Sequence, residues 1–290
     1  MNETLKRSIS GAVYIILLIA SILYSTESFF ILFGVFMLIA IFEFCNLVQL
    51  NKIFPVILGS TLYGYSSYML FNKTYIDNLD LILLGITLVI SIKCIVFLFD
   101  NNIDKVGPFL KYIYLTGYII LPFILLTKIT ALGQFNTNSV YTLKTYSPKI
   151  ILGVFILIWT NDTFAYIVGK SIGKHKLFER ISPKKTIEGF IGGIIFAIFA
   201  GFLISKYYIR PSANHLEQSI VIWTITAFLV SIFGTIGDLI ESKFKRVAGV
   251  KDSGKIMPGH GGILDRLDSV IFVAPFIYLF YQILNYVTFS

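Results

Sequence analysis

Residues 242–268 hold the densest run of side chains able to do chemistry, and long apolar stretches flank it on both sides. Six Lys/Arg, three Asp and one His stand in this run, and a glycine pair follows the His. A charged residue near a hydrocarbon layer costs about 2.5–3.5 kcal/mol on insertion scales. A cluster of charged residues beside apolar segments therefore indicates a functional site. Clustered carboxylates and lysines suit a magnesium ion that carries substrate phosphates. The alternative interpretation is a solvated loop.

Three aspartates border this run and the apolar segments around it. Asp238 lies about one turn inside the end of the preceding segment, and Asp265 and Asp268 open the following one. Because Asp265 and Asp268 are three residues apart, they are neighbours on a helix that starts there. His260 adds an imidazole in a flexible turn, and zinc is disfavoured because no further His or Cys lies nearby. A buried, hydrogen-bonding role is the alternative for Asp238.

A second polar stretch, residues 159–190, interrupts the apolar pattern upstream. Asp162 stands in an otherwise apolar helix and shares one face with Tyr166, four residues later. The Ser-Pro-Lys-Lys-Thr segment 182–186 then leads into the next apolar stretch. A lysine-rich turn at a helix N-terminus favours an anion through backbone N–H groups, the helix dipole and the lysines. A basic loop that only fixes membrane topology is an equal alternative.

The composition decides which elements must position these residues. Of 290 residues, 56% are hydrophobic and 14% charged, whereas soluble domains carry about 25% charged residues. This predicts an all-α, polytopic transmembrane helical bundle surrounded by membrane lipids, with no nucleic-acid partner. Cys45 and Cys94 fall inside apolar segments and are interpreted as buried apolar side chains. The first apolar segment lacks a small-residue cleavage site and is interpreted as a retained helix.

About nine apolar segments reach the roughly 20 residues needed to cross a bilayer. We expect a transmembrane scaffold in residues 1–145 and a catalytic transmembrane domain in 146–290, with basic loops at 169–187 and 241–267. On the side of these loops fall 16 Lys/Arg, against 6 on the other side. The positive-inside rule therefore predicts the N-terminus and both loops inside and the C-terminus outside. The predicted spans are 8–24, 28–48, 53–71, 81–99, 109–131, 149–168, 188–208, 219–240 and 268–287.

Two ionisable residues in the predicted scaffold have open roles. Glu43 lies near the inner end of the second span, and Lys93 lies in the fourth. Charges within spans are usually functional. Glu43 is also close enough to the interface to reach water, and Lys93 is long enough to snorkel to the inner surface.

The 242–268 segment resembles the signature of the phosphatidate cytidylyltransferases, also called CDP-diacylglycerol synthases. Met257 stands where that family usually has Leu, Ile or Phe, which is a conservative departure. The stretch from Asp162 to Gly189 is similar to the family's second motif, with Lys170 where Arg is common. The resemblance covers roughly 159–275, and the N-terminal half matches only as apolar spans. The signature positions present are Ser242, Lys245, Arg246, Lys251, Asp252, Pro258, His260, Gly261, Gly262, Asp265, Arg266 and Asp268.

The resemblance implies that CTP and phosphatidate react to give CDP-diacylglycerol and pyrophosphate, in a homodimer of the cell (inner) membrane whose active site faces the cytoplasm. We expect Asp238, Asp265 and Asp268 to hold Mg²⁺, with Asp268 bound to the ion directly or through another ligand, and the number of cations, one or two, is left open. Asp265, Asp238, Lys251 and His260 are the expected catalytic residues, with His260 orienting pyrophosphate or moving a proton. The expected CTP and phosphate-binding residues are Ser182, Lys184, Lys185, Thr186, Lys245, Arg246 and Asp162, the last of which is expected to bind a cation or brace Lys184.

Three other classes of protein share parts of this pattern. A CTP-dependent polyprenol kinase-like enzyme would share the basic nucleotide loop but should lack the complete His-Gly-Gly-x-x-Asp-Arg-x-Asp run. A secondary transporter would place charges along an ion path, yet the sequence has no visible inverted repeat and its charge gathers at one face. A purely structural protein would leave the clustered acids without a purpose.

Overall fold

The computed structural model of the chain describes residues 3–72, 77–100, 107–132, 146–211 and 213–289. Lys73, Lys105 and Lys144, which the charge count includes, lie outside these ranges. The described chain is almost entirely helical, with one small hairpin. Its elements are α1 (Glu3–Tyr24), α2 (Thr26–Val48), α3 (Ile53–Phe71), α4 (Asp77–Phe99), α5 (Pro108–Tyr114), the π-helical η1 (Leu115–Ile120), α6 (Leu121–Ile129), α7 (Pro148–Ile172), β1 (Lys176–Phe178), β2 (Ser182–Thr186), α8 (Ile187–Leu203), the π-helical η2 (Ile204–Ile209), the 3₁₀ turn η3 (Ala213–His215), α9 (Leu216–Val247) and α10 (Leu264–Phe289).

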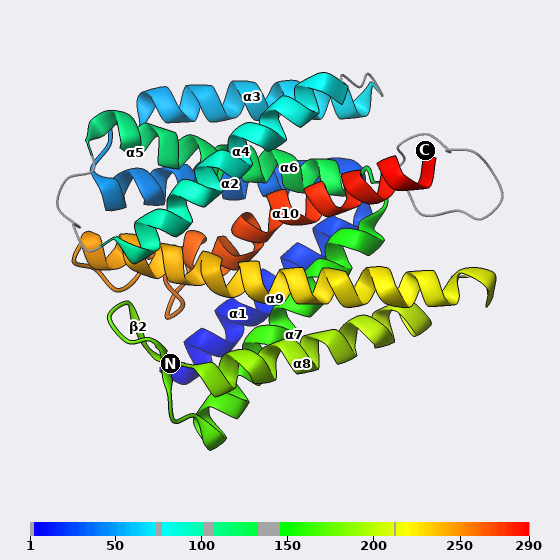
Figure 1. Cartoon of the computed structure of the whole chain (residues 1–290). Coiled ribbons are helices and arrows are strands. Elements are labelled where there is room, and N and C mark those ends of the chain that lie inside the picture. The colour runs from blue at the N-terminus through cyan, green and yellow to red at the C-terminus, as the bar shows by residue number, and fades with distance from the viewer. Residues whose placement is uncertain (1–2, 73–76, 101–106, 133–145, 212, 290) are drawn as a thin grey trace.

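The helices run along one bundle in alternating directions (Figure 1). The start of α1, the β-hairpin and the end of α9 lie at one end of the bundle, and the end of α10 lies at the other. Among the described residues, eight helical segments are long and apolar enough to span a membrane, and α3 is the helix at a predicted span that is not among them. The chain is thus a multi-pass helical bundle, while the count of nine spans and the orientation of the termini stay predictions.

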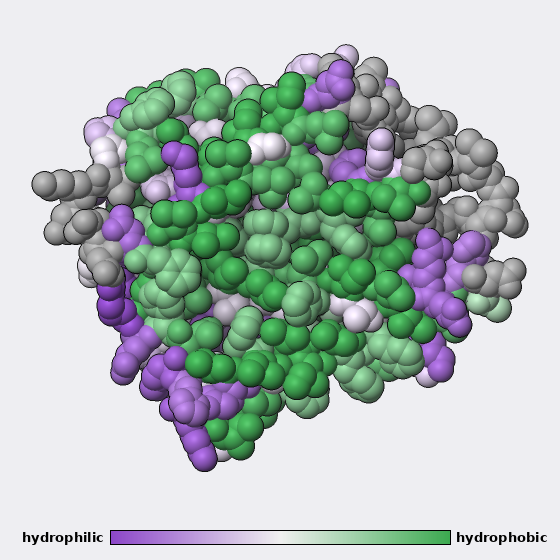
Figure 2. Space-filling model, viewed as in Figure 1, coloured by the Kyte–Doolittle hydropathy of each residue, from purple (hydrophilic) through white to green (hydrophobic). Residues whose placement is uncertain are grey.

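The surface of the bundle follows the same division. Figure 2 shows a broad apolar band across the middle of this face, with hydrophilic residues gathered at its two ends. Many large apolar side chains on α1, α4 and α8 point outward, among them Ile16, Val89 and Ile195. Exposed apolar area of this extent matches a lipid environment, since soluble monomers rarely expose large apolar patches.

Local sequence signals explain where several helices begin and end. Pro108 and Pro148 occupy the first turns of α5 and α7, where a missing N–H costs nothing. Pro122 follows η1. Its ring lacks an N–H and clashes with the carbonyl one turn earlier in a regular α-helix, so the helix widens to a π-helix there. The α9 helix ends at Val247, and Gly249 two residues later has a φ of 68°, the left-handed conformation that closes a helix C-terminus.

One aromatic cluster makes α9 longer than the sequence pattern predicts. Phe244 is buried, and its ring lies 5.0 Å from that of Phe44 and 4.9 Å from that of Phe97. These ring contacts join α9 to α2 and α4, and they stabilise about two further turns of α9. The helix therefore continues to Val247, and the predicted loop 241–267 is wrong for its first seven residues.

The predicted lysine-rich turn at 182–186 is also corrected. These residues form strand β2, which pairs antiparallel with β1 through Lys176 opposite Thr186. Thr186 is the N-cap of α8, and its hydroxyl accepts a hydrogen bond from the Gly189 N–H at 3.1 Å. The segment thus reaches a helix N-terminus as expected, but as an extended strand. A hairpin fixes the direction of its lysines more firmly than a free loop would.

Candidate active site

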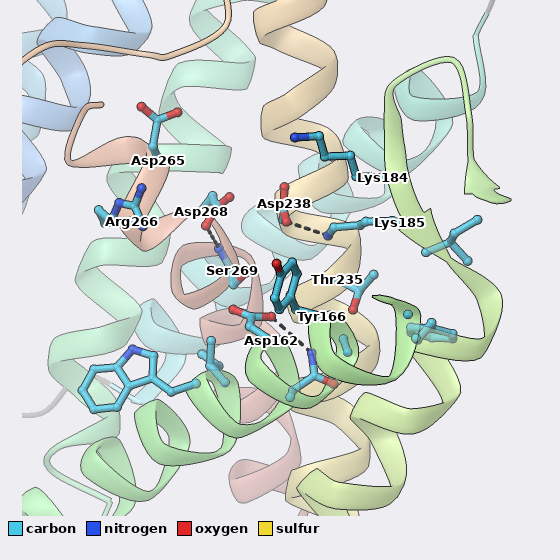
Figure 3. A pocket seen from close by; sticks show the side chains of 18 of the residues that line it. Asp162, Tyr166, Lys184, Lys185, Thr235, Asp238, Asp265, Arg266, Asp268 and Ser269 are labelled. Carbon is cyan, nitrogen blue, oxygen red and sulfur yellow. Dashed lines mark hydrogen bonds and ion pairs between the residues drawn. The ribbon is translucent and has the colours of Figure 1, made fainter. Parts of the chain in front are cut away.

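A cavity of about 980 Å³ opens among the helices. Both predicted polar stretches line it, together with α1. Figure 3 shows acidic and basic side chains from α7, α9, α10 and the hairpin around this space. Its apolar wall includes Ile15, Ile158 and Trp159, from α1 and α7. The cavity therefore offers one charged and one apolar lining.

Three carboxylates from three helices face the cavity. They belong to Asp162 on α7, Asp238 on α9 and Asp268 on α10, and each lies within electrostatic range of the other two. The Asp238 carboxylate pairs with the Lys185 Nζ at 2.6 Å, with both side chains about a third exposed to the cavity. Carboxylates held this close repel one another, so a cation between them lowers their energy. Lys185 supplies part of that charge.

Asp265 lies at the rim of this group and turns toward the loop before α10 (Figure 3). Its Oδ2 accepts hydrogen bonds from the Ser253 N–H at 2.9 Å and the Gly262 N–H at 2.7 Å. Its Oδ1 pairs with the Lys245 Nζ at 2.7 Å. Both oxygens of this predicted metal ligand are thus engaged by the protein itself. The Lys245 ammonium, predicted to bind phosphate, contacts Glu241 as well.

Glu43 has a definite place in the structure. Its carboxylate is buried and accepts hydrogen bonds from the N–H groups of Ile263 at 3.1 Å and Leu264 at 2.8 Å. The Ser253 hydroxyl donates to it at 3.3 Å. A carboxylate at the start of α10 satisfies orphan N–H groups and complements the helix dipole. Glu43 therefore fixes the loop before α10 from a distant helix, while Lys93 lies exposed on α4.

The other predicted site residues divide between the cavity and the surface. Lys184, Thr186 and His260 line the cavity. Burial lowers the pKa of His260, and the charges of Arg266 and Arg7 lower it further. Outside the lining, Lys251 and Arg246 are exposed and Ser182 is half-buried. The Arg246 Nε donates instead to the Ile181 carbonyl at 3.3 Å.

Sequence reasoning missed two polar residues beside the cavity. Glu241 is fully buried against Lys245, four residues later on α9. Asn161 is 2% exposed, lines the cavity beside Asp162, and its Oδ1 has no hydrogen-bond partner. The spacing from Asp238 to Glu241 to Lys245 puts all three near one face of a helix, which is a signal available in the sequence. Asn161 stands next to Asp162 in an apolar run and could have been noticed on that ground.

The glycines of α8 allow this helix to pack closely against α7 within the same chain. A Cβ on Gly192 would meet the Val168 side chain at 2.7 Å, and one on Gly193 would meet the Asn161 Oδ1 at 2.7 Å. Gly189 likewise packs against the Ala165 carbonyl of α7. Small residues of this kind let two membrane helices approach closely. They bring Asp162 and the hairpin to the same cavity.

The donor set suits a magnesium ion that is shared with a substrate. Among the described residues, no three His, Cys, Asp or Glu side chains form a ready metal cage. Magnesium commonly takes only one or two protein carboxylates and completes its shell with water and substrate phosphates. Asp162, Asp238 and Asp268 all line the cavity, so one or two of these carboxylates could bind such an ion beside a substrate phosphate.

The fold and this cavity define a multi-pass membrane protein with a charged site between its helices. A sequence profile of the cytidylyltransferase family matches residues 5–284, and the chain belongs to this family. It is 34% identical to the phosphatidate cytidylyltransferase of Bacillus subtilis over 287 residues, which are 96% of this chain and 97% of that one.

Staphylococcal relatives align over a shorter region. The phosphatidate cytidylyltransferase of Staphylococcus epidermidis is 47% identical over 135 residues, which are 47% of this chain and 50% of that protein. The one from Staphylococcus saprophyticus is 39% identical over 181 residues, which are 57% of this chain and 66% of that protein. The chain thus matches about half the length of the first of these relatives.

Proposed function

We propose that this chain transfers the cytidylyl group of CTP to phosphatidate. The products are CDP-diacylglycerol and pyrophosphate, which makes the chain a phosphatidate cytidylyltransferase of phospholipid synthesis. The observation that carries the proposal is the cavity, in which three carboxylates and the Lys185 ammonium share a space with an apolar wall. Such a space suits a nucleotide and a lipid phosphate together. The end-to-end similarity to the Bacillus subtilis enzyme supports the same reaction.

The chemistry follows from the charges of the two substrates. A phosphate oxygen of phosphatidate forms a bond to the α-phosphorus of CTP, and the bond from that phosphorus to the bridging oxygen breaks. The electron pair leaves with pyrophosphate. A phosphate monoester is largely ionised at pH 7, since its second pKa is about 6, so no strong base is required. Both reactants are anionic, and fixed cations must offset their repulsion.

Each polar group of the cavity has a role in this proposal. Lys185 and Lys184 bind the phosphates from the hairpin side. Asp162, Asp238 and Asp268 would hold magnesium, which when bound supplies positive charge near the α-phosphate. Asp265 and Lys245 hold the loop 253–262 in place through the contacts described above. The apolar wall of α1 and α7 receives the acylglycerol part of phosphatidate.

A labelling experiment tests the reaction itself. The purified chain in detergent micelles is given phosphatidate, a polyprenol, magnesium and CTP labelled at either the α- or the γ-phosphate. We expect α-label in a liponucleotide and γ-label in pyrophosphate. Transfer of γ-label to a prenol, without a liponucleotide, would favour the kinase instead.

A magnesium titration tests the acidic residues. We expect Asp238→Asn to lose most turnover and to need more magnesium, because one cavity carboxylate is gone. Glu217→Gln, exposed near the other end of α9, is the matched control. Turnover of Asp238→Asn close to that of the control would remove the metal assignment.

We also propose that the cavity faces the cytoplasm from the cell membrane, because CTP is cytosolic and both basic segments lie at one end of the bundle. The chain's two cysteines are buried, so a single exposed cysteine can report the side. Glu179→Cys in the hairpin should react with a membrane-impermeant maleimide only in opened cells. Reaction in intact cells would reverse the orientation. The homodimer stays a prediction, which cross-linking in native membranes would test.

A further inference from the structure

Helix α1, from the half of the chain expected to be a scaffold, contacts the loop that carries His260. The Ser10 hydroxyl oxygen lies 2.8 Å from the His260 Nδ1. The same oxygen lies 3.0 Å from the carbonyl oxygen of Pro258 and 3.0 Å from that of Arg7. One side chain of α1 thus joins the imidazole, the loop backbone and its own helix.

Counting protons at Ser10 fixes the form of the imidazole. A hydroxyl donates one hydrogen, and a carbonyl oxygen can only accept. With carbonyl oxygens of Pro258 and Arg7 both at 3.0 Å, the hydroxyl hydrogen belongs to one of them. Of the two contacts that remain, the one to His260 Nδ1 at 2.8 Å is a hydrogen bond only if Nδ1 carries a hydrogen and donates it to Ser10. If the hydroxyl donated to Nδ1 instead, its oxygen would face both carbonyl oxygens with no hydrogen between them. In the neutral ring, Nε2 is then unprotonated and can accept.

The surroundings of the ring agree with this form. Burial and the charges of Arg266 and Arg7 lower the pKa of His260, which favours the neutral ring at pH 7. A Cβ on Gly11 would lie 3.2 Å from the His260 Cε1 and 3.5 Å from its Nε2. The Cε1–Nε2 edge of the ring thus packs against Gly11, which has no side chain to cover it. Both residues line the cavity. Among the described residues no hydrogen-bond donor contacts Nε2, which leaves this atom open to the cavity.

Arg266 holds the same residue from the other side. Its guanidinium donates to the His260 carbonyl oxygen, from Nη2 at 2.7 Å and Nε at 3.3 Å. The loop backbone is therefore held by α10, and the ring is held by α1. Two anchors of this kind leave the imidazole little freedom to rotate.

We propose that Ser10 is a positioning residue that holds His260 in the Nδ1–H form and presents Nε2, as a hydrogen-bond acceptor, to a donor group of the bound substrate. The proposal rests on the proposed cytidylyl transfer for its kinetic consequence, whereas the state of the ring can be measured without turnover. Ser10 itself touches no reacting atom. It acts through the imidazole.

Long-range ¹H–¹⁵N spectra of protein labelled at histidine nitrogens test the ring directly, at pH 7.5 in detergent. The chain has only three histidines, and His260→Gln assigns the relevant signals. We expect a protonated Nδ1 and an unprotonated Nε2 in the wild type, and a mixture of both forms in Ser10→Ala. The signals of His175 and His215 should stay unchanged. A wild-type spectrum with the hydrogen on Nε2 would overturn the proposal, whether or not the chain makes a liponucleotide.

A double-mutant cycle tests the kinetic role. We expect Ser10→Ala to lower kcat about 10-fold, the effect of losing one well-placed hydrogen bond, and Ser10→Thr to restore it. Ser21→Ala, which removes a hydroxyl bonded only within α1, is the matched control. In a His260→Gln background, Ser10→Ala should have no further effect. A second 10-fold loss in that background would show that Ser10 acts through helix packing, and the positioning role would be wrong.

Discussion

Two ion pairs of the same length occupy opposite ends of the bundle and differ in what surrounds them. Lys185 Nζ and Asp238 Oδ2 lie 2.6 Å apart in the cavity, with 27% and 34% of their side chains exposed. Lys128 Nζ and Asp80 Oδ1 are also 2.6 Å apart, but only 8% and 12% exposed, outside the cavity lining. In the first pair, Lys185 can leave Asp238 and bind a substrate in the cavity. In the second pair, Lys128 has no such space beside it. Exposure, rather than distance, separates a working pair from a structural one.

The largest expected effect concerns the cavity pair. Lys185→Met should lower kcat about 10²–10³-fold, because one preorganised cation facing the phosphates is lost. Its thermal midpoint in detergent should stay close to wild type, because ion pairs about a third exposed contribute little stability. Kinetics with labelled CTP and a melting curve check both. A large loss of stability with normal turnover would reverse the comparison.

The buried pair should show the opposite pattern. Lys128→Met leaves the Asp80 carboxylate buried without a partner, which we expect to cost about 3–5 kcal/mol of unfolding free energy. Turnover per folded molecule should stay within about twofold, since neither residue lines the cavity. Unfolding in detergent and kinetics on the folded fraction measure the two quantities. An unchanged unfolding free energy would contradict the structural role.

Removing both partners of the buried pair sharpens this test. Asp80→Asn combined with Lys128→Met should recover about 0.5–3 kcal/mol relative to Lys128→Met alone, because the uncompensated charge is gone. The same unfolding assay applies. Additive losses would mean that the two side chains do not act as a pair.

The smallest expected effect is on the pH profile. Turnover that needs neutral His260 falls as pH drops through its lowered pKa. Arg7→Gln removes one of the two charges that lower this pKa, while Arg266 remains. The acid limb of kcat/KM should therefore move to higher pH, by less than about one unit because Arg7 is exposed and screened. His260→Gln, measured in parallel, subtracts the titration of the substrate phosphate. A shift to lower pH would contradict the assigned cause.

The sequence predicts the helices better than it predicts the partners of the charged residues. Runs of about 20 apolar residues locate the helices, because spanning a bilayer sets both their length and their composition. Lys185 and Asp238 were both expected at the site, and they meet in the cavity. The sequence can bring these two residues forward because charge near a membrane edge is a local property, and their roles stay predictions.

The sequence does not reveal a residue's surroundings where these come from distant segments. Asp265 carries the same signature as Asp268, yet its oxygens are taken by Lys245, Ser253 and Gly262. Phe244 extends α9 only because α2 and α4 bring aromatic rings to it. No periodicity in one segment contains that information. The role of Ser10 depends in the same way on how α1 lies against a loop some 250 residues away.

The Glu43 contact has a consequence for the order in which the chain is made. Its carboxylate belongs to the second helix, but it accepts from the N–H groups of Ile263, just before the last helix, and Leu264, the first residue of that helix. Because the chain is synthesised from its N-terminus, Glu43 is made long before these two N–H groups and lacks its final hydrogen-bond partners during most of synthesis. The loop that carries His260 can reach its final position only after α10 is made. A chain that is still incomplete therefore has a cavity without its final lining.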